Sequence, residues 1–183
     1  MDHVEADRMG EVEAEGRMIA ENSTHGFFPL ASFEDIPLDL ANQLLAQWGH
    51  KMGPLLRGNS GSKGCHALFV HGKPVALTTM SSLIRERVGG LPHLTRDNTI
   101  ELSRLCASNS WSCRVVLRLW REVIFPSCGY QFAVSYQDAD LHSGNIYRFD
   151  GWQRAAFSRS GIDQRSGRNG RNKWVWIWPR LVP

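Results

Sequence analysis

The segment "VSYQDADLHSGNIYRFDGW", residues Val134–Trp152, carries three acids, one histidine and two tyrosines directly after a short apolar run. The run "GYQFAVSY", residues 129–136, has the composition of a buried strand, and "DLHSGNIYRF", residues 140–149, that of a short helix. Connections between a strand and a helix are usually short. Since ligands bind at the carboxyl ends of strands in open α/β sheets, these polar residues predict a functional site beside a sheet.

Residues on both sides of this segment show strand and helix patterns in turn. Apolar residues at helical spacing follow Asp39 and predict a helix that ends near Gly49. The run "SWSCRVVLRLWREVIF" predicts a basic amphipathic helix stopped by Pro126. Residues 85–98 are rich in turn formers and predict a loop. Strands are predicted at residues 26–33, 65–70, 74–84, 99–108, 129–136, 152–160 and 173–179. The order predicts a mixed α/β architecture.

Charge divides the chain into an acidic beginning and a basic body. Residues 1–40 contain ten acids and two bases, whereas the rest of the chain contains eight acids and nineteen bases. Residues 1–25 have only a weak apolar stripe, so we expect a mobile acidic arm followed by a single domain over residues 26–183. A basic body predicts a polyanionic partner.

Composition argues against several classes of protein. The hydrophobic share of 42% and the charged share of 21% are those of a soluble globular domain, and no apolar run has the roughly 18 residues of a membrane span. We therefore expect no membrane partner. The acidic N-terminus is unlike a signal peptide, so we expect a cytoplasmic protein. The four cysteines form no C-x-x-C pair, which favours reduced, mostly buried thiols over a disulfide framework or a zinc site.

The order of elements over about residues 27–180 resembles the GNAT fold, the N-acetyltransferase-like superfamily. This resemblance implies an α/β fold with a mixed, mostly antiparallel sheet flanked by helices. In GNAT enzymes a glycine-rich turn, Gln/Arg-x-x-Gly-x-Gly/Ala, holds the pyrophosphate of acetyl-CoA at a helix N-terminus. The corresponding stretch here, "RLCASNSWSCRV", contains no glycine, so the standard acetyl-CoA loop is absent. Ser110 and Ser112 are candidate cofactor-binding residues for a smaller anion, and they can equally, with Ser108, cap the helix.

Five further motifs resemble the Mom family of bacteriophage DNA-modification proteins. They are "WGH", "ELSRL", "VSYQD", "HSGNIYRFDGW" and "KWVWIWP". The resemblance implies a GNAT-like transferase that places a carbamoylmethyl group from an unidentified small-molecule donor on the exocyclic amine of adenine in double-stranded DNA, which protects phage DNA from host restriction. Two alternatives remain open. One is an acyl-CoA-dependent N-acetyltransferase with a degenerate cofactor loop, acting on a small amine or protein, and the other is a DNA-binding module without catalytic activity.

Six residues are candidate catalytic groups on this hypothesis. Arg104 has a planar guanidinium that can clamp a carboxylate, a phosphate or a developing oxyanion, and strict strand alternation places it on the opposite face from Glu101. Asp138 and His142 are suited to proton transfer. Tyr147 stands where GNAT enzymes commonly carry a tyrosine that protonates the leaving group. The full set is His50, Arg104, Ser135, Asp138, His142 and Tyr147.

Structural roles account for the same residues without catalysis. Asp138 can be a turn residue, and Tyr147 can simply pack a helix on the sheet. His142 can be an exposed helix residue, and His50 can interact with the dipole at a helix C-terminus. Asp140 is expected to cap the helix that follows it.

The C-terminal region combines basic residues with an aromatic strand. Arg159, Arg165, Arg168, Arg171 and Lys173 are candidate DNA-binding residues because cations in a glycine-rich loop suit phosphate contacts. Alternation places Trp174, Trp176 and Trp178 on one face, where sheet packing and base stacking are both possible. A metal ion is a further possibility, since His50, Asp138, Asp140 and His142 are potential ligands, but their spacing assigns no ligand set.

Overall fold

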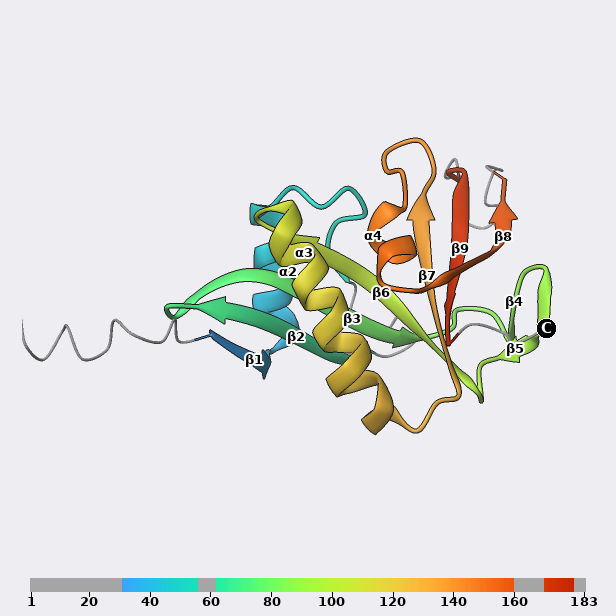
Figure 1. Cartoon of the computed structure of the whole chain (residues 1–183), viewed down its shortest axis with the longest axis horizontal. Coiled ribbons are helices and arrows are strands. Elements are labelled where there is room, and N and C mark those ends of the chain that lie inside the picture. Colours follow the sequence, from blue (N-terminus) through green and yellow to red (C-terminus); the bar gives the residue numbers. More distant parts are fainter. Residues whose placement is uncertain (1–30, 56–61, 160–169, 180–183) are drawn as a thin grey trace, which may run out of the picture.

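The computed structural model describes residues 31–55, 62–159 and 170–179 of the chain. A seven-stranded sheet with the order β1-β2-β3-β6-β7-β9-β8 forms its centre (Figure 1). The strands of this sheet are β1 (Ala31–Asp35), β2 (Ser62–Val70), β3 (Lys73–Ser82), β6 (Thr99–Ala107), β7 (Phe132–Asp138), β8 (Gln153–Ser158) and β9 (Lys173–Trp178). Among the described strands, β6 and β7 are parallel and the other neighbours are antiparallel. The predicted mixed, mostly antiparallel sheet is confirmed.

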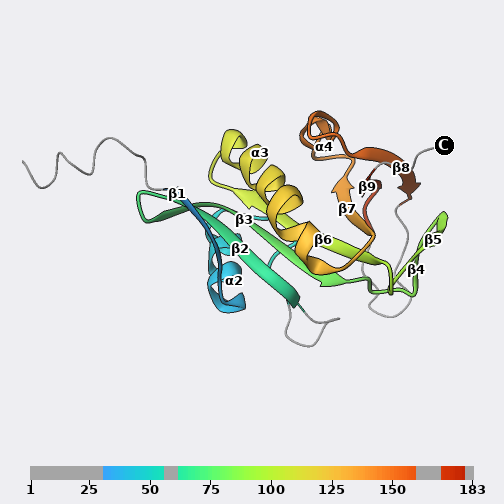
Figure 2. The ribbon, with the colours of Figure 1, turned by 60° about the horizontal axis from the view of Figure 1, so that its bottom comes forward.

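Helices cover both faces of the sheet (Figure 2). The helices are α2 (Leu38–Gln47), α3 (Ser110–Leu119) and α4 (Asn145–Phe149). α3 and α4 lie on one face, where Leu117 and Tyr147 pack with Ile100, Leu102 and Trp176. α2 lies on the opposite face, where its buried residues pack against β2, β3 and β6; this cluster includes Leu44, Leu45, Ala67, Leu77 and Cys106. We refer to the two sides as the α3 face and the α2 face.

A β-bulge in β6 changes which of its residues share a face. The register between β3 and β6 shifts at Ser103, whose hydroxyl lies 3.0 Å from the hydroxyl of Thr79. Glu101 pairs with Ser81, and Arg104 pairs with Thr79. Since Ser81 and Thr79 are alternate residues of one strand, Glu101 and Arg104 lie on the same face, the α2 face. The prediction that strict alternation separates these two side chains is wrong.

A second, two-stranded sheet occupies residues 85–98, where the sequence predicts a loop. β4 (Arg87–Val88) and β5 (Leu91–Thr95) form a short antiparallel hairpin. Its apolar residues Val88, Leu91 and Leu94 pack against β7 and β9. The glycines and the proline that suggest a loop therefore belong to a hairpin whose apolar side covers the α2 face beyond β6.

The helix that starts at Ser110 differs from the prediction at both ends. The side chain of Asn109 accepts a hydrogen bond of 2.8 Å from the Ser112 N–H, so the cap is an asparagine and the prediction of a serine cap is wrong. At its other end α3 continues into a π-helical turn, Trp120–Ile124, and a 3₁₀ turn, Phe125–Cys128. The chain stays helical through Pro126 because proline is tolerated in the first turn of a new helical segment.

The loop before α4 ends at a glycine. Gly144 is the N-cap of α4, has a φ of 73° and provides no side-chain cap. The expected cap at Asp140 is therefore wrong. A Cβ on Gly144 would contact the side chains of Gln137 and Trp176, so glycine is required here both by the backbone conformation and by close packing.

Three further predictions concern the N-terminal arm, the cysteines and a membrane span. Residues 1–30, which include the predicted acidic arm and the start of the predicted first strand, lie outside the described part of the chain. All four cysteines are free thiols, two of them buried and two half-buried, as expected. None of the described helices is long and apolar enough to span a membrane.

Candidate active site

The two central strands separate where the predicted site residues lie. β6 and β7 are paired only from Thr99–Glu101 to Phe132–Val134. Beyond these residues β6 remains paired with β3 and β7 with β9, so a gap opens between their C-terminal halves (Figure 1). Where strands diverge, backbone N–H and C=O groups on the facing edges lose their strand partners, and an extended ligand can pair with such groups.

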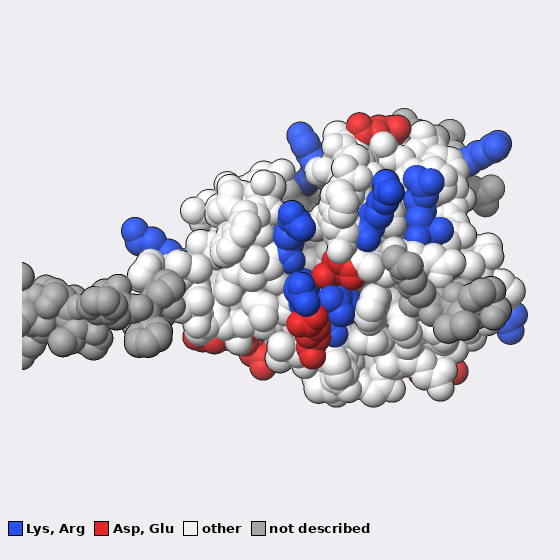
Figure 3. Space-filling model, in the orientation of Figure 1, with Lys and Arg blue, Asp and Glu red and all other residues white. Residues whose placement is uncertain are grey.

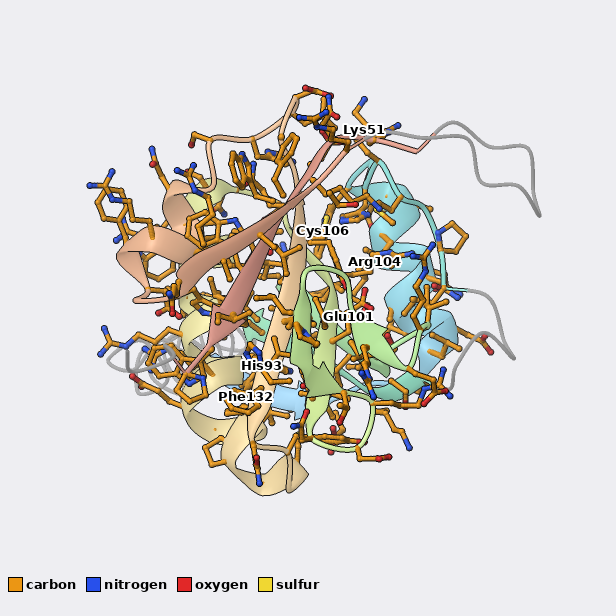
Figure 4. All side chains as sticks on the ribbon, turned by 90° about the vertical axis from the view of Figure 1, so that its right-hand side faces the viewer. Lys51, His93, Glu101, Arg104, Cys106 and Phe132 are labelled. Carbon is orange, nitrogen blue, oxygen red and sulfur yellow. The ribbon has the colours of Figure 1, made fainter. Side chains whose placement is uncertain are left out.

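Glu101 stands on the α2 face at the last paired position before the gap. Burial raises the pKa of its carboxyl to about 7, and this value already includes the opposing effects of Arg104 and Lys173, whose positive charges lower it. Figure 4 shows Glu101, Arg104 and Cys106 in succession along β6, between α2 and β7. A carboxyl with a pKa near 7 exchanges protons readily at neutral pH, which is the property of a general acid or base.

Arg104 joins β6 to the turn that follows α2. Its Nε donates to the carbonyl of Gly53 at 3.3 Å and its Nη1 to the carbonyl of Ser103 at 2.7 Å. The turn is also fixed by Asn42, whose side-chain amide exchanges two hydrogen bonds with the backbone of Leu55, at 2.8 and 3.0 Å. These hydrogen bonds hold the guanidinium in one orientation beside Glu101. Its Nη2 has no hydrogen-bond partner among the described residues.

His50 lies in this turn and is electrostatically coupled to Arg104 and His142. Burial is the main cause that lowers the pKa of His50 to about 4, and the positive charge of Arg104 and the His142 side chain lower it further. The imidazole is therefore neutral at pH 7. Its Nδ1 accepts a hydrogen bond of 3.3 Å from the Met52 N–H, so the proton resides on Nε2. The structure brings together His50, Arg104 and His142, three of the six candidate catalytic residues.

Asp138 is committed to structural hydrogen bonds. Its carboxylate accepts from the backbone N–H groups of Asp140 and Leu141, at 3.0 and 3.2 Å, and from Arg171 Nη1 at 3.0 Å. Partial burial raises its pKa, but these hydrogen bonds and the charge of Arg171 outweigh burial, and the net effect lowers it. The three hydrogen bonds give Asp138 a structural role in the turn after β7. They also make its carboxylate a weaker proton acceptor than that of Glu101.

Ser135 and Tyr147 occupy the other side of the gap, on the α3 face. The Ser135 hydroxyl donates to the carbonyl of Leu102 at 3.0 Å, across the gap, and lies 2.8 Å from the Tyr147 hydroxyl. Trp176 stacks on the tyrosine ring with centroids 5.5 Å apart. Burial raises the pKa of Tyr147 to about 12, although the hydrogen bond between its hydroxyl and Ser135 lowers it. Ser135 and Tyr147 therefore lie on the opposite face of the sheet from Arg104.

Gln137 fixes the loop that carries His142. Its side-chain amide donates to the backbone carbonyls of Asp138, at 3.0 Å, and His142. Its Oε1 accepts from the indole N–H of Trp176 at 2.9 Å. The residue is buried, and the three bonds connect β7, the loop and β9. Gln137 is absent from the predicted site, although a glutamine inside a buried apolar strand is itself a sequence signal, because buried amides are held by hydrogen bonds.

The two serines predicted to bind a cofactor lie at the N-terminus of α3 and differ in exposure. Ser110 is exposed, whereas Ser112 is buried at 2% exposure and its backbone N–H is already capped by Asn109. An anion at this helix end would meet the remaining first-turn N–H groups and the Ser110 hydroxyl. Part of the helix N-terminus is thus occupied by the protein's own cap.

Basic residues are distributed over both faces. Arg171 and Lys173 lie beside Asp138 and Glu101, Arg159 is exposed at the end of β8, and Arg165 and Arg168 lie outside the described residues. Figure 3 shows further basic side chains with acidic ones between them on the face covered by α3 and α4. There Arg118 pairs with Glu122 at 3.0 Å and Arg121 pairs with Asp150 at 2.8 Å. Pairing reduces the positive charge that this helix presents to a polyanion.

The possible metal ligands do not converge in the part of the chain that the structure describes. No group of three or more His, Cys, Asp or Glu side chains there is arranged to hold a metal ion. The predicted set of His50, Asp138, Asp140 and His142 therefore forms no such group among these residues.

Glu101 is the main functional candidate that sequence reasoning missed. Its neighbours on the α2 face include Tyr136, whose pKa burial raises to about 12 with a further contribution from the charge of Glu101, opposed by Arg85. The signal that could have found it is the paired charge in "ELSR". That pair of charges indicates a shared face only if the β-bulge at Ser103 is known, and no local sequence pattern predicts the bulge.

The fold is that of the GNAT N-acetyltransferases. The E. coli ribosomal-protein-S18-alanine N-acetyltransferase superposes with a TM-score of 0.57 at 14% identity, over 84% of this chain and 96% of that one. An N-acetyltransferase from Staphylococcus aureus Mu50 gives 0.54 at 13% identity, over 80% and 96% of the two chains. Arabidopsis thaliana Naa50, in complex with a CoA-peptide bisubstrate analogue, gives 0.52 at 8% identity, over 83% and 99%. No protein-family model and no curated protein matches the sequence.

Proposed function

We propose that the protein transfers an acyl-type group to an amine and that Glu101 is the general base. The observation that carries this proposal is the Glu101 carboxyl with a pKa near 7, beside Arg104, at the point where β6 and β7 separate. An amine that approaches from the α2 face would attack a donor carbon held in the gap. As the new N–C bond forms and the bond from the donor carbon to its leaving group breaks, the amine proton passes to the Glu101 carboxylate.

Arg104 and His50 would assist from the same face. The fixed guanidinium would stabilise negative charge that develops on the donor oxygen, because a preorganised cation in a partly buried site acts without reorganisation. The neutral His50 would hold the acceptor through its Nε2–H. Ser135 and Tyr147 lie on the other side of the gap, where the Tyr147 hydroxyl, which keeps its proton because its pKa is raised, would protonate the leaving group in exchange for its hydrogen bond with Ser135.

The narrower form of the proposal is transfer to the exocyclic amine of adenine in DNA. Its support is the resemblance of the motifs around Arg104, Val134–Trp152 and Lys173 to the Mom family, together with the basic excess outside residues 1–40. A base in a duplex would have to be extruded to reach Glu101. Arg171 and Lys173 stand on the α2 face, where the backbone of such a substrate would pass.

A second candidate is acyl-CoA-dependent N-acetylation of a small amine or a protein. In its favour, two of the similar structures, from E. coli and Staphylococcus aureus Mu50, are N-acetyltransferases, and the match extends over more than 95% of each of those chains. Against it, the loop before α3 lacks glycine and Asn109 occupies part of the helix N-terminus that would hold the cofactor pyrophosphate.

The test is a mass-spectrometric analysis of nucleosides from plasmid DNA of cells that express the protein. We expect a modified deoxyadenosine with the wild type, a loss of at least 100-fold with Glu101→Gln and no change with Glu34→Gln, an exposed acid on β1. Unmodified DNA, combined with calorimetric binding of acetyl-CoA by the purified protein, would favour the second candidate. Equal modification by Glu101→Gln would refute the role of Glu101.

A further inference from the structure

Three large aromatic side chains are exposed on the α3 face. Trp111, in the first turn of α3, is 66% exposed, and Phe149, at the end of α4, is 67% exposed. Phe157 on β8 is 43% exposed and pairs with Trp174 of β9, whose side chain packs against the core of this face. Soluble proteins seldom expose several large rings on one side without a partner. The three rings therefore indicate a binding surface.

Arginine side chains lie over the rings of this surface. The guanidinium carbon of Arg114, one helical turn after Trp111, is 5.8 Å from the centre of the Phe149 ring. The guanidinium carbon of Arg154 is 4.2 Å from the ring centre of Trp174. In Figure 1 the elements that carry these pairs, α3, α4, β9 and β8, follow one another across the α3 face. We call this region the aromatic–arginine surface; its residues are Trp111, Arg114, Phe149, Arg154, Phe157 and Trp174.

The arginines of this surface carry positive charge that no described acid compensates. Arg114 and Arg154 are exposed and form no ion pair with any described residue, and the same holds for Arg148 on α4. The neighbouring Arg118 and Arg121 differ, because acidic side chains pair with both of them. Figure 3 shows basic side chains spread over this face. Exposed cations without an acidic partner attract a polyanion.

The partner of such a surface must offer both flat rings and negative charges. Single-stranded nucleic acid offers both, because its unpaired bases have free ring faces and its phosphates are charged. In a duplex the same ring faces are stacked on neighbouring base pairs, and only the phosphates remain for contact. An acidic peptide would supply the charges without a regular series of rings. The combination of exposed rings and unpaired arginines therefore favours a single strand.

We propose that the aromatic–arginine surface binds single-stranded nucleic acid, with bases stacked on Trp111 and Phe149 and phosphates beside Arg114, Arg148 and Arg154. The surface is independent of the proposed transfer reaction. None of its residues is assigned to that reaction, and it lies on the opposite face of the sheet from the proposed general base. DNA and RNA strands share the chemistry that the surface recognises, and the experiment separates them.

The experiment is a fluorescence-anisotropy titration of labelled oligothymidylate and oligouridylate, each of about 12 nucleotides, with the full chain. We expect saturable binding, and the tighter of the two ligands identifies DNA or RNA as the preferred strand. Trp111→Ala and Phe149→Ala should each weaken binding about 5- to 100-fold, the effect of one lost base stack. Trp111→Phe keeps a ring and should restore most of the affinity. Val123→Ala, which shortens an exposed aliphatic side chain on the helical segment after α3, is the matched control and should bind as the wild type does.

The salt dependence of binding separates stacking from charge. Arg114→Gln combined with Arg154→Gln should reduce the slope of log affinity against log salt by up to about 1.4, roughly 0.7 for each lost phosphate contact with a single strand. Trp111→Ala removes no charge, so it should lower the affinity and leave the slope unchanged. An abasic phosphodiester chain of the same length keeps the charges without the bases. It should bind the wild type at least about 10-fold more weakly than oligothymidylate does.

A measurement on the wild type covers the case in which an alanine variant fails to fold. Ultraviolet cross-linking of an oligomer that contains 5-bromodeoxyuridine should attach it to Trp111 or Phe149, as mapped by mass spectrometry. The proposal is overturned if neither oligomer binds saturably, if the abasic chain binds as tightly as oligothymidylate, or if folded Trp111→Ala and Phe149→Ala both bind as the wild type does. Cross-links that avoid both rings would also overturn it, because the strand would then lie on another surface.

Discussion

At the scale of single residues, the ionisation of Glu101 is determined by where the backbone places it. The residue is half-buried on the α2 face, and burial raises the pKa of its carboxyl more than Arg104 and Lys173 lower it. Asp138, the fifth residue of the segment that first suggests a site, has the opposite balance because three donors surround it. Two carboxyl groups on one face thus differ in role, and only Glu101 is suited to proton transfer at neutral pH.

Because burial disfavours the charged form of Glu101, this residue destabilises the folded protein at neutral and alkaline pH. Its pKa is higher in the folded than in the unfolded chain, so stability is lost as the pH rises from about 4.5 to about 7. Glu101→Gln cannot ionise, and above pH 7 we expect it to raise the free energy of unfolding by about 1–3 kcal/mol relative to the wild type. Urea denaturation of both proteins at pH 4 and pH 8 measures this, and a difference that is the same at both values would contradict it.

At the scale of secondary-structure elements, the loop between β7 and α4 is held by close packing around one glycine. Gly144 has a φ of 73°, and an added Cβ would lie 2.6 Å from the ring of Trp176 and would collide with Gln137. Gly144→Ala should therefore destabilise the protein by about 3 kcal/mol, from backbone strain together with steric overlap. Gly129→Ala is the matched control, because Gly129 has the same φ of 73° with no atom within 4 Å, and it should cost only about 1 kcal/mol. Equal losses in thermal denaturation would show that the contacts with Gln137 and Trp176 carry no cost.

Sequence patterns predict the elements better than they predict the site. The order of strands and helices is recoverable because burial imposes a period on each element, as in the alternating tryptophans of β9, whose Trp176 is buried on the α3 face. Polar residues at strand and helix ends also predict the region in which His50, Arg104 and His142 lie near one another, and their catalytic roles stay predictions. Sequence patterns do not predict that Glu101 and Arg104 share a face, because this depends on the β-bulge at Ser103. The division of the site between two faces likewise follows from strand divergence, which is a property of the sheet and not of any segment.

At the scale of the whole molecule, the sheet separates two kinds of chemistry. The α2 face presents ionisable groups around the gap between β6 and β7, and the α3 face presents aromatic packing around Tyr147. Of the basic residues predicted to meet DNA, Arg159 follows β8, Arg171 and Lys173 lie at the start of β9, and Arg165 and Arg168 lie outside the described residues.

The basic loop between β8 and β9 provides a test of DNA as the partner. If Arg165 and Arg168 touch phosphates, their joint replacement by Gln should reduce the slope of log affinity against log salt by up to about 1.8, roughly 0.9 for each lost contact. Arg171 is left intact because it pairs with Asp138. Arg118→Gln, whose side chain pairs with Glu122 on the α3 segment, is the control and should leave the slope unchanged. An unchanged slope in the loop variant would place any DNA contact elsewhere.

The proposed function requires that Glu101, the last residue of β6 paired with β7, exchanges protons near neutral pH. A direct measurement is the ¹³C NMR titration of the Glu101 side-chain carboxyl in the folded protein, assigned by comparison with Glu101→Gln. The structure predicts a midpoint near pH 7, which should move upward in Arg104→Gln because the arginine's charge is one of the two that lower it. A midpoint near 4.5, the ordinary value for a glutamate, would contradict the assignment of Glu101 as the general base.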